Sequence, residues 1–177
     1  MKQGDLFDPQ PHRVPLADMV ELVHKSQEPC PYCHCRTTLL PHRICKRKIE
    51  VLATLAQYLR AGDEWVRVET GRGLQGSISK KWTTTAYRAS EHVARLEWYG
   101  LAERQGHRSG LWRILPAGLR FLRGELAVPA KILTTQGRTI YVSEETVLID
   151  DVRGVDLDKA YWDAYPWADF LDQEPTS

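Results

Sequence analysis

The stretch VARLEWYGLAERQGHRSGLWRILPAGLRFL, residues 93–122, decides the expected fold because its hydrophobic pattern changes twice. It begins with apolar residues at the spacing of an α-helix. Residues 101–115 then alternate as two strands around a turn from Gly106 to Gly110. PAGLRFLRGEL, residues 116–126, closes as a short helix. This order predicts a helix, a β-hairpin and a second helix.

The residues before this stretch predict three further elements. KRKIEVLATLAQYLRAG, residues 46–62, has helical spacing and stops at Gly62. EWVRVE, residues 64–69, alternates as a short strand. TTTAYRASEHVARLEWYGLAER, residues 83–104, begins with threonines suited to capping a helix. GRGLQG, residues 71–76, matches neither the dinucleotide fingerprint nor a phosphate-binding P-loop, so we interpret its glycines as a loop.

Helix, strand, helices and a two-stranded hairpin follow one another in the order of a winged helix. Residues 93–122 resemble the MarR-like winged-helix regulators, in which a Leu-x3-Gly-Leu run ends the recognition helix and Arg residues lie in the wing. The resemblance covers residues 45–124 and implies a DNA-binding fold. This sequence has LPAG where those regulators usually carry a Thr before the Gly, and it lacks their long dimerisation helices.

The exposed face of the predicted recognition helix offers donors, acceptors and planar groups once its apolar residues turn inward. Such a face can read base edges in a major groove about 12 Å wide, while cations before the helix and in the hairpin meet phosphate or the minor groove. The residues predicted to contact DNA are Lys80, Lys81, Thr84, Tyr87, Arg88, His92, Arg95, Arg104, His107, Arg108 and Arg113. The alternative is a solvated surface on which Arg88 and Arg95 pair with Glu91.

EPCPYCHCRTTLLPHRICKRK, residues 28–48, holds all 4 cysteines and 2 of the 6 histidines. CPYC is the dithiol motif of glutaredoxins, but the preceding LADMVELVHKS is spaced like a helix rather than the strand such a fold requires. PCPYC also matches half of the zinc deaminase motif, but no histidine begins the other half, H-x-E. We therefore favour neither a redox centre nor a catalytic metal site.

The remaining pattern is Cys30-x2-Cys33, eight residues, then His42-x2-Cys45. Two close pairs separated by a loop each hold one edge of a tetrahedron, which predicts structural Zn²⁺ closed to substrate. The site resembles a treble-clef or zinc-ribbon knuckle, although those usually read C-P-x-C-G and this chain does not. Cys35 is an alternative ligand in place of His42. The other reading is a set of buried free cysteines that bind nothing.

The composition is ordinary for a globular protein, with 42% hydrophobic and 27% charged residues. No apolar run approaches the roughly 18 residues that span a bilayer, and the first residues lack the apolar core of a signal peptide. We therefore expect a cytoplasmic protein without a membrane segment. No Ser/His/Asp, paired-carboxylate or open metal constellation stands out, so we expect no enzyme.

Charge is divided unevenly along the chain. Residues 1–143 hold 22 Lys and Arg against 13 Asp and Glu, while residues 144–177 hold 2 against 10. KILTTQGRTIYVSEETVLIDDV, residues 131–152, predicts a hairpin about Gln136-Gly137. The acidic segment that follows contains Tyr161, Trp162, Tyr165, Trp167 and Phe170. These aromatics suit docking onto a protein partner, and equally well suit packing back over the winged-helix domain.

Together these patterns predict an α+β protein: a winged helix with an N-terminal zinc-binding module, a C-terminal β-hairpin and an acidic aromatic tail. The expected function is a non-catalytic protein that binds double-stranded DNA, as a transcriptional or mobile-element regulator. The alternative is a protein–protein adaptor or inhibitor that engages host machinery, since a knuckle joined to a wing also looks like small phage proteins. The predicted segments are a flexible arm at 1–14, helix and knuckle at 15–45, winged helix at 46–125, hairpin extension at 126–155 and tail at 156–177.

Overall fold

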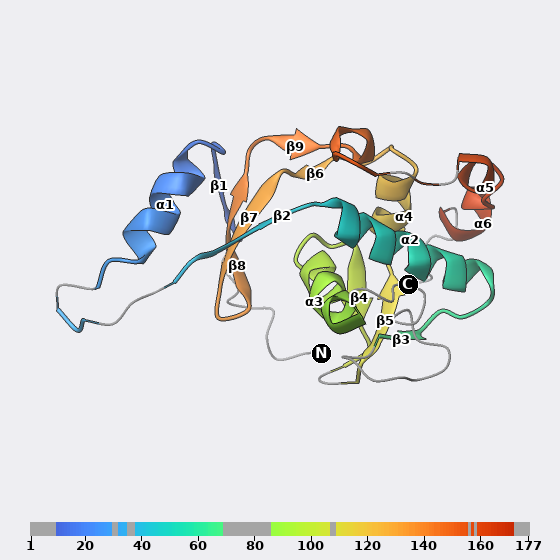
Figure 1. The fold of residues 1–177 in the computed structure, drawn as a ribbon, viewed down its shortest axis with the longest axis horizontal. Coiled ribbons are helices and arrows are strands. Elements are labelled where there is room, and N and C mark those ends of the chain that lie inside the picture. The colour runs from blue at the N-terminus through green and yellow to red at the C-terminus, as the bar shows by residue number, and fades with distance from the viewer. Residues whose placement is uncertain are drawn as a thin grey trace. The chain divides into compact units, whose positions relative to one another are not determined.

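The computed structural model confirms a mixed α+β chain (Figure 1). It describes residues 10–29, 32–34, 38–68, 86–106, 109–155, 157 and 159–171, and the side chains of residues 86–89 are not included. The chain divides into two compact units. Unit 1 comprises Met1–Arg43 and Pro129–Thr146, and unit 2 comprises Ile44–Val128 and Val147–Ser177.

Unit 1 is built on a four-stranded sheet in the order β1-β8-β7-β2. Its elements are β1 (His12–Val14), α1 (Asp18–Ser26), β2 (Leu40–Arg43), β7 (Lys131–Thr135) and β8 (Arg138–Ser143). The blue and cyan N-terminal strands flank the orange hairpin in Figure 1, β1 parallel to β8 and β2 antiparallel to β7. The hairpin predicted about Gln136-Gly137 is confirmed, with positive φ angles of 49° and 77° at these two residues. That backbone twist suits a two-residue hairpin turn.

Two expectations for the N-terminal residues are wrong. Residues 12–14 were expected in a flexible arm, but they form β1, because the backbone of β8 offers them a partner that no local pattern announces. The helix expected to open the segment at 15–45 begins later, at Asp18, where α1 starts. One face of α1 buries Met19 completely against Leu39 and Leu133.

Unit 2 contains α2 (Lys46–Arg60), β3 (Val66–Arg67), α3 (Ala86–Glu97), β4 (Ala102–Arg104), β5 (Leu111–Ile114) and α4 (Pro116–Leu122). A three-stranded antiparallel sheet has the order β3-β5-β4. The helix, strand, hairpin and short closing helix predicted here are confirmed, while the predicted capping threonines lie outside the described residues. Further along are β6 (Val128–Pro129), β9 (Thr146–Val147), the 3-10 helix η2 (Ile149–Asp151), α5 (Lys159–Asp163) and α6 (Trp167–Leu171). β6 and β9 pair with each other.

Gly118 marks the closest approach within the core of unit 2. A Cβ atom at this position would lie 2.3 Å from the carbonyl oxygen of Leu101 and 2.8 Å from Cγ1 of Ile114. That carbonyl also accepts a hydrogen bond of 3.0 Å from the backbone N–H of Leu115, so it is held in place. Glycine at the start of α4 therefore lets the helix pack directly on the backbone that enters β4.

The aromatic residues of the acidic tail pack back against unit 2, the second of the two destinations considered from the sequence. Trp162 and Tyr165 are buried, with 9% and 3% of their surface exposed. The hydroxyl of Tyr165 donates a 2.8 Å hydrogen bond to the carbonyl of Ala56 on α2. The ring of Trp167 lies 4.5 Å from that of Tyr165, between centroids. The tail is thus part of the core of unit 2.

Candidate nucleic-acid interface and metal residues

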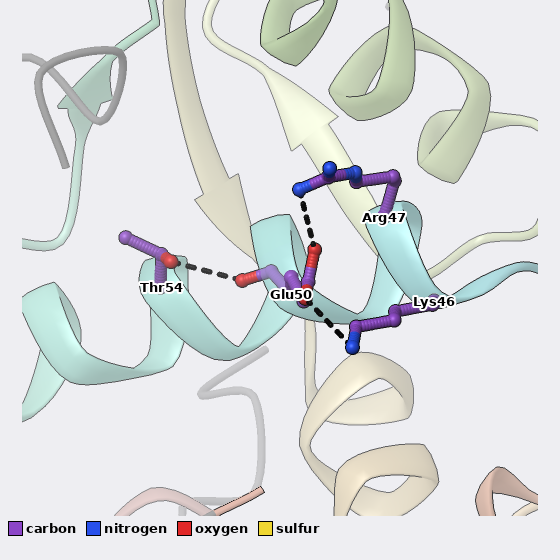
Figure 2. A network of polar contacts seen from close by, with 4 residues as sticks. All are labelled: Lys46, Arg47, Glu50 and Thr54. Carbon is purple, nitrogen blue, oxygen red and sulfur yellow. Dashed lines mark hydrogen bonds and ion pairs between the residues drawn. The ribbon is translucent and has the colours of Figure 1, made fainter. Parts of the chain in front are cut away.

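Helix α2 begins with three cations, Lys46, Arg47 and Lys48, directly after Cys45. The N-terminus of a helix carries partial positive charge, so acidic side chains stabilise it and basic ones do not. The first turn of α2 contains no acidic residue. Its charge is balanced from the next turn, where the Glu50 carboxylate lies 3.9 Å from Lys46 Nζ and 3.3 Å from Arg47 Nη1 (Figure 2). One carboxylate therefore faces a run of three cations.

The second helix of the site contributes His92, which was predicted to contact DNA. Its ring is half-buried, and Nδ1 is enclosed without a hydrogen-bond partner among the described residues. Burial lowers the pKa of His92, and the charges of Lys48, Arg95 and Arg47 lower it further, opposed by Glu91. Arg47, Lys48 and Arg95 therefore lie near enough to His92 to influence its pKa. We call Arg47, Lys48, His92 and Arg95 the cationic cluster.

Within this cluster, Lys48 is the unexpected member. Only 4% of its surface is exposed, although lysine is almost never buried in globular proteins unless it has a partner. It lies on α2, outside the predicted recognition helix. The signal was nevertheless in the sequence, because the KRK run at residues 46–48 falls where a helix N-terminus normally carries acids or polar caps.

Arg95 forms the ion pair that the alternative interpretation anticipated. Its Nη2 lies 3.4 Å from a carboxylate oxygen of Glu91, one turn earlier on α3, and 33% of the Arg95 side chain is exposed. Exposed pairs at this spacing contribute only about 0.3–0.5 kcal/mol to stability. Such a pair leaves Arg95 able to exchange its carboxylate for a phosphate at small cost.

The hairpin arginines are engaged within the sheet. Arg113 on β5 donates to Glu103 on β4 and to Glu64, and its guanidinium lies 4.7 Å above the ring of Trp65. Arg104 lies 5.4 Å above the ring of Trp112, on the neighbouring strand. A DNA contact by Arg113 would have to displace two carboxylates, whereas Arg104 gives up only a cation–π contact.

The structure does not describe the side chains of several residues that were predicted to contact DNA. Lys80, Lys81, Thr84, His107 and Arg108 lie outside the described residues. Tyr87 and Arg88 lie on α3, and their side chains are likewise outside the description.

The predicted zinc ligands are described only in part. Cys33 is exposed in unit 1, and Cys45 is the partly exposed N-cap residue of α2 in unit 2. His42 lies on β2, where its Nε2 is 2.9 Å from the hydroxyl of the buried Thr134. A hydroxyl placed in this way orients the ring, so a metal would have to bind Nδ1. Cys30 and Cys35 lie outside the described residues.

No group of three His, Cys, Asp or Glu side chains that suits a metal ion occurs within the part of the chain that the structure describes. Two of the five candidate ligands are missing from that part, so the zinc site stays a prediction.

Among the described helices, none is long and apolar enough to cross a membrane. Comparison of the chain with protein-family models, curated proteins and solved structures found no match.

Proposed function

We propose that the protein binds double-stranded DNA through unit 2, as a non-catalytic regulator built on a winged helix. The observation that carries the proposal is the arrangement around α3. This helix is followed directly by the β4–β5 hairpin, β5 also pairs with β3, and α2 and α4 pack beside them. In winged-helix domains the helix before the hairpin enters the major groove, and the hairpin lies beside it on the backbone or minor groove.

The charges around α3 support this assignment. The cationic cluster joins the first turn of α2 to α3, and the carboxylates of Glu50 and Glu91 lie against two of its arginines. A DNA phosphate beside the cluster would accept hydrogen bonds from the cationic side chains. The counterions bound near that phosphate would then be released into solution. In this proposal α3 reads base edges, Arg47 and Arg95 of the cluster hold phosphate, and Arg104 with the hairpin tip contacts the neighbouring groove.

Fluorescence anisotropy of labelled duplex DNA over a salt series tests the proposal. We expect affinity to fall steeply as salt rises, with the logarithmic slope flattened by about one for each phosphate contact removed. Arg95→Gln should show such a flattening, whereas Arg138→Gln, an exposed cation of unit 1, is the matched control and should not. Absence of binding at low salt would remove the proposal.

We further infer that structural Zn²⁺ stabilises the N-terminal module through Cys30, Cys33, His42 and Cys45, with Cys35 as an alternative ligand. The oriented ring of His42 and the thiols of Cys33 and Cys45, which form no disulfide, are compatible with that role. Elemental analysis of protein purified without added metal should find about one zinc per chain. A folded chain free of metal would refute the inference.

A protein–protein adaptor is the second candidate. It is favoured by the internal engagement of Arg113 with two carboxylates, which removes one cation from the proposed DNA surface. Absence of DNA binding at low salt by the folded protein would favour this second function.

A further inference from the structure

Unit 1 carries an open groove of about 520 Å³. All of its lining residues belong to unit 1, so none of them is part of the proposed DNA surface of unit 2. A groove of this volume is within the usual range for ligand sites. The residues that line it come from the start of α1, from β2 and from the segment entering β7: Leu16, Val20, Pro41, His42, Arg43, Ala130 and Lys131.

The apolar wall of the groove is the part of the α1 face that the core of unit 1 does not use. Leu16, Met19, Val20 and Val23 have the apolar spacing of one helix face. Met19 is fully buried, whereas 36% of Leu16 and 53% of Val20 are exposed. The helix turns only part of its apolar stripe to the sheet. The remainder forms an exposed apolar surface, which in soluble proteins marks interaction sites.

The opposite wall is positively charged. Arg43 on β2 and Lys131 on β7 are directly opposite in the antiparallel register, and His42 lies beside them. None of the described lining residues is acidic. Two cations facing each other beside an exposed apolar wall complement a ligand that is both acidic and apolar.

The backbone around the groove is well fixed. The N–H of Leu16 donates a 2.7 Å hydrogen bond to a carboxylate oxygen of Glu145. The N–H of Ala130 donates to the carbonyl of Glu145 at 2.9 Å, and that of Lys131 to the hydroxyl of Ser143 at 3.1 Å. The groove is therefore preformed. The carboxylate of Glu145 keeps its negative charge while it fixes Leu16, so it offsets part of the positive charge of Arg43 and Lys131.

Strand addition does not explain the groove. β2 is an edge strand of the sheet, but Pro41 in its middle has no N–H to donate to an added strand. A partner must bind mainly through side chains. Carboxylates would meet Arg43 and Lys131, while apolar side chains would cover Leu16 and Val20.

We propose that this groove docks a partner protein through a segment that combines acidic and large apolar side chains. A nucleic acid would satisfy the cations but would leave the apolar wall uncovered. The proposal does not depend on DNA binding by unit 2.

Fluorescence anisotropy of a labelled peptide of alternating Leu and Glu, titrated with the full-length protein, tests the docking site. A peptide of alternating Leu and Lys is the charge control. We expect the acidic peptide to bind more tightly, and Val20→Asp and Lys131→Glu each to weaken it about tenfold, equal to about 1.4 kcal/mol. Arg138→Glu makes the same charge change at an exposed position of β8 outside the groove and should leave affinity unchanged.

Four results would overturn the proposal. These are failure of the acidic peptide to bind, equal binding of the two peptides, an unchanged affinity in both groove variants, and displacement of the peptide by duplex DNA while Val20→Asp has no effect. A wild-type dimer in sedimentation that Val20→Asp dissociates would assign the groove to a second copy of the chain instead. Because Val20 is largely exposed, the variant should keep the wild-type circular dichroism spectrum and melting temperature.

Discussion

Replacing Gly118 with alanine should destabilise unit 2, although alanine is the better helix former. The new Cβ would lie 2.3 Å from the carbonyl oxygen of Leu101, a backbone atom that no side-chain rotation can move. Relief requires α4 to move away from the segment entering β4, which also stretches the hydrogen bond from Leu115 to Leu101. Overpacking of this kind costs about 3 kcal/mol when backbone has to shift. The helix propensity of alanine returns about 1 kcal/mol.

The expected net loss is therefore about 2 kcal/mol, or a decrease of roughly 8 °C in the melting temperature of a unit of this size. Urea unfolding followed by tryptophan fluorescence measures it, because Trp112 and Trp162 are buried in the same core. Gly106→Ala is the control, since nothing lies within 4 Å of a Cβ there and its φ is not positive. Equal stability of Gly118→Ala and wild type would show that α4 accommodates the methyl group and would refute the argument.

Three further perturbations follow from contacts of unit 2. Tyr165→Phe removes the hydrogen bond to the carbonyl of Ala56 and should lower the free energy of unfolding in urea by about 1 kcal/mol. Because burial raises the pKa of Tyr165, its hydroxyl should also resist ionisation in an alkaline absorbance titration of the folded protein. The pKa of His92 in the folded protein is lowered from its ordinary 6.5, so as pH falls the unfolded chain binds the proton before the folded chain does. The free energy of unfolding should therefore decline as pH falls below about 6.5. His92→Gln should lessen that decline, and an identical pH profile would contradict the assignment. Arg113→Met should lower stability by up to about 1 kcal/mol while leaving DNA affinity unchanged, whereas Arg104→Met should weaken binding in the same anisotropy assay.

The elements that the sequence predicted correctly are those with a local signature. The helix of α2 follows from its apolar spacing, and the turn at Gln136-Gly137 follows from residues that tolerate positive φ. The pairing of β1 with β8 has no such signature, because a strand of three residues offers no pattern and its partner lies far along the chain. The apolar spacing of α1 also does not show which of its apolar residues are buried, because that depends on where β7 and Leu39 lie.

The sequence could predict which residues of α3 turn inward, but it could not predict the contacts that the polar side chains of the candidate DNA surface make. Apolar spacing on α3 correctly turned Val93 and Leu96 inward. It could not show that Nδ1 of His92 is enclosed, because that depends on the packing of α2. Nor could it show that Arg113 meets Glu64, which lies 49 residues away in the chain and is joined to it only by folding.

The discontinuity of unit 1 has a consequence for synthesis on the ribosome. Strand β2 ends at Arg43, and its only neighbour in the sheet, β7, begins at Lys131. At about 5–20 residues per second, β2 emerges roughly 4 to 18 seconds before the strand that completes it. During that interval Leu39 and Met19 have no hairpin to cover them, while the residues of unit 2 from Ile44 to Val128 are being made. Met19 and Leu39 thus leave the ribosome well before Leu133, which they contact in the folded unit.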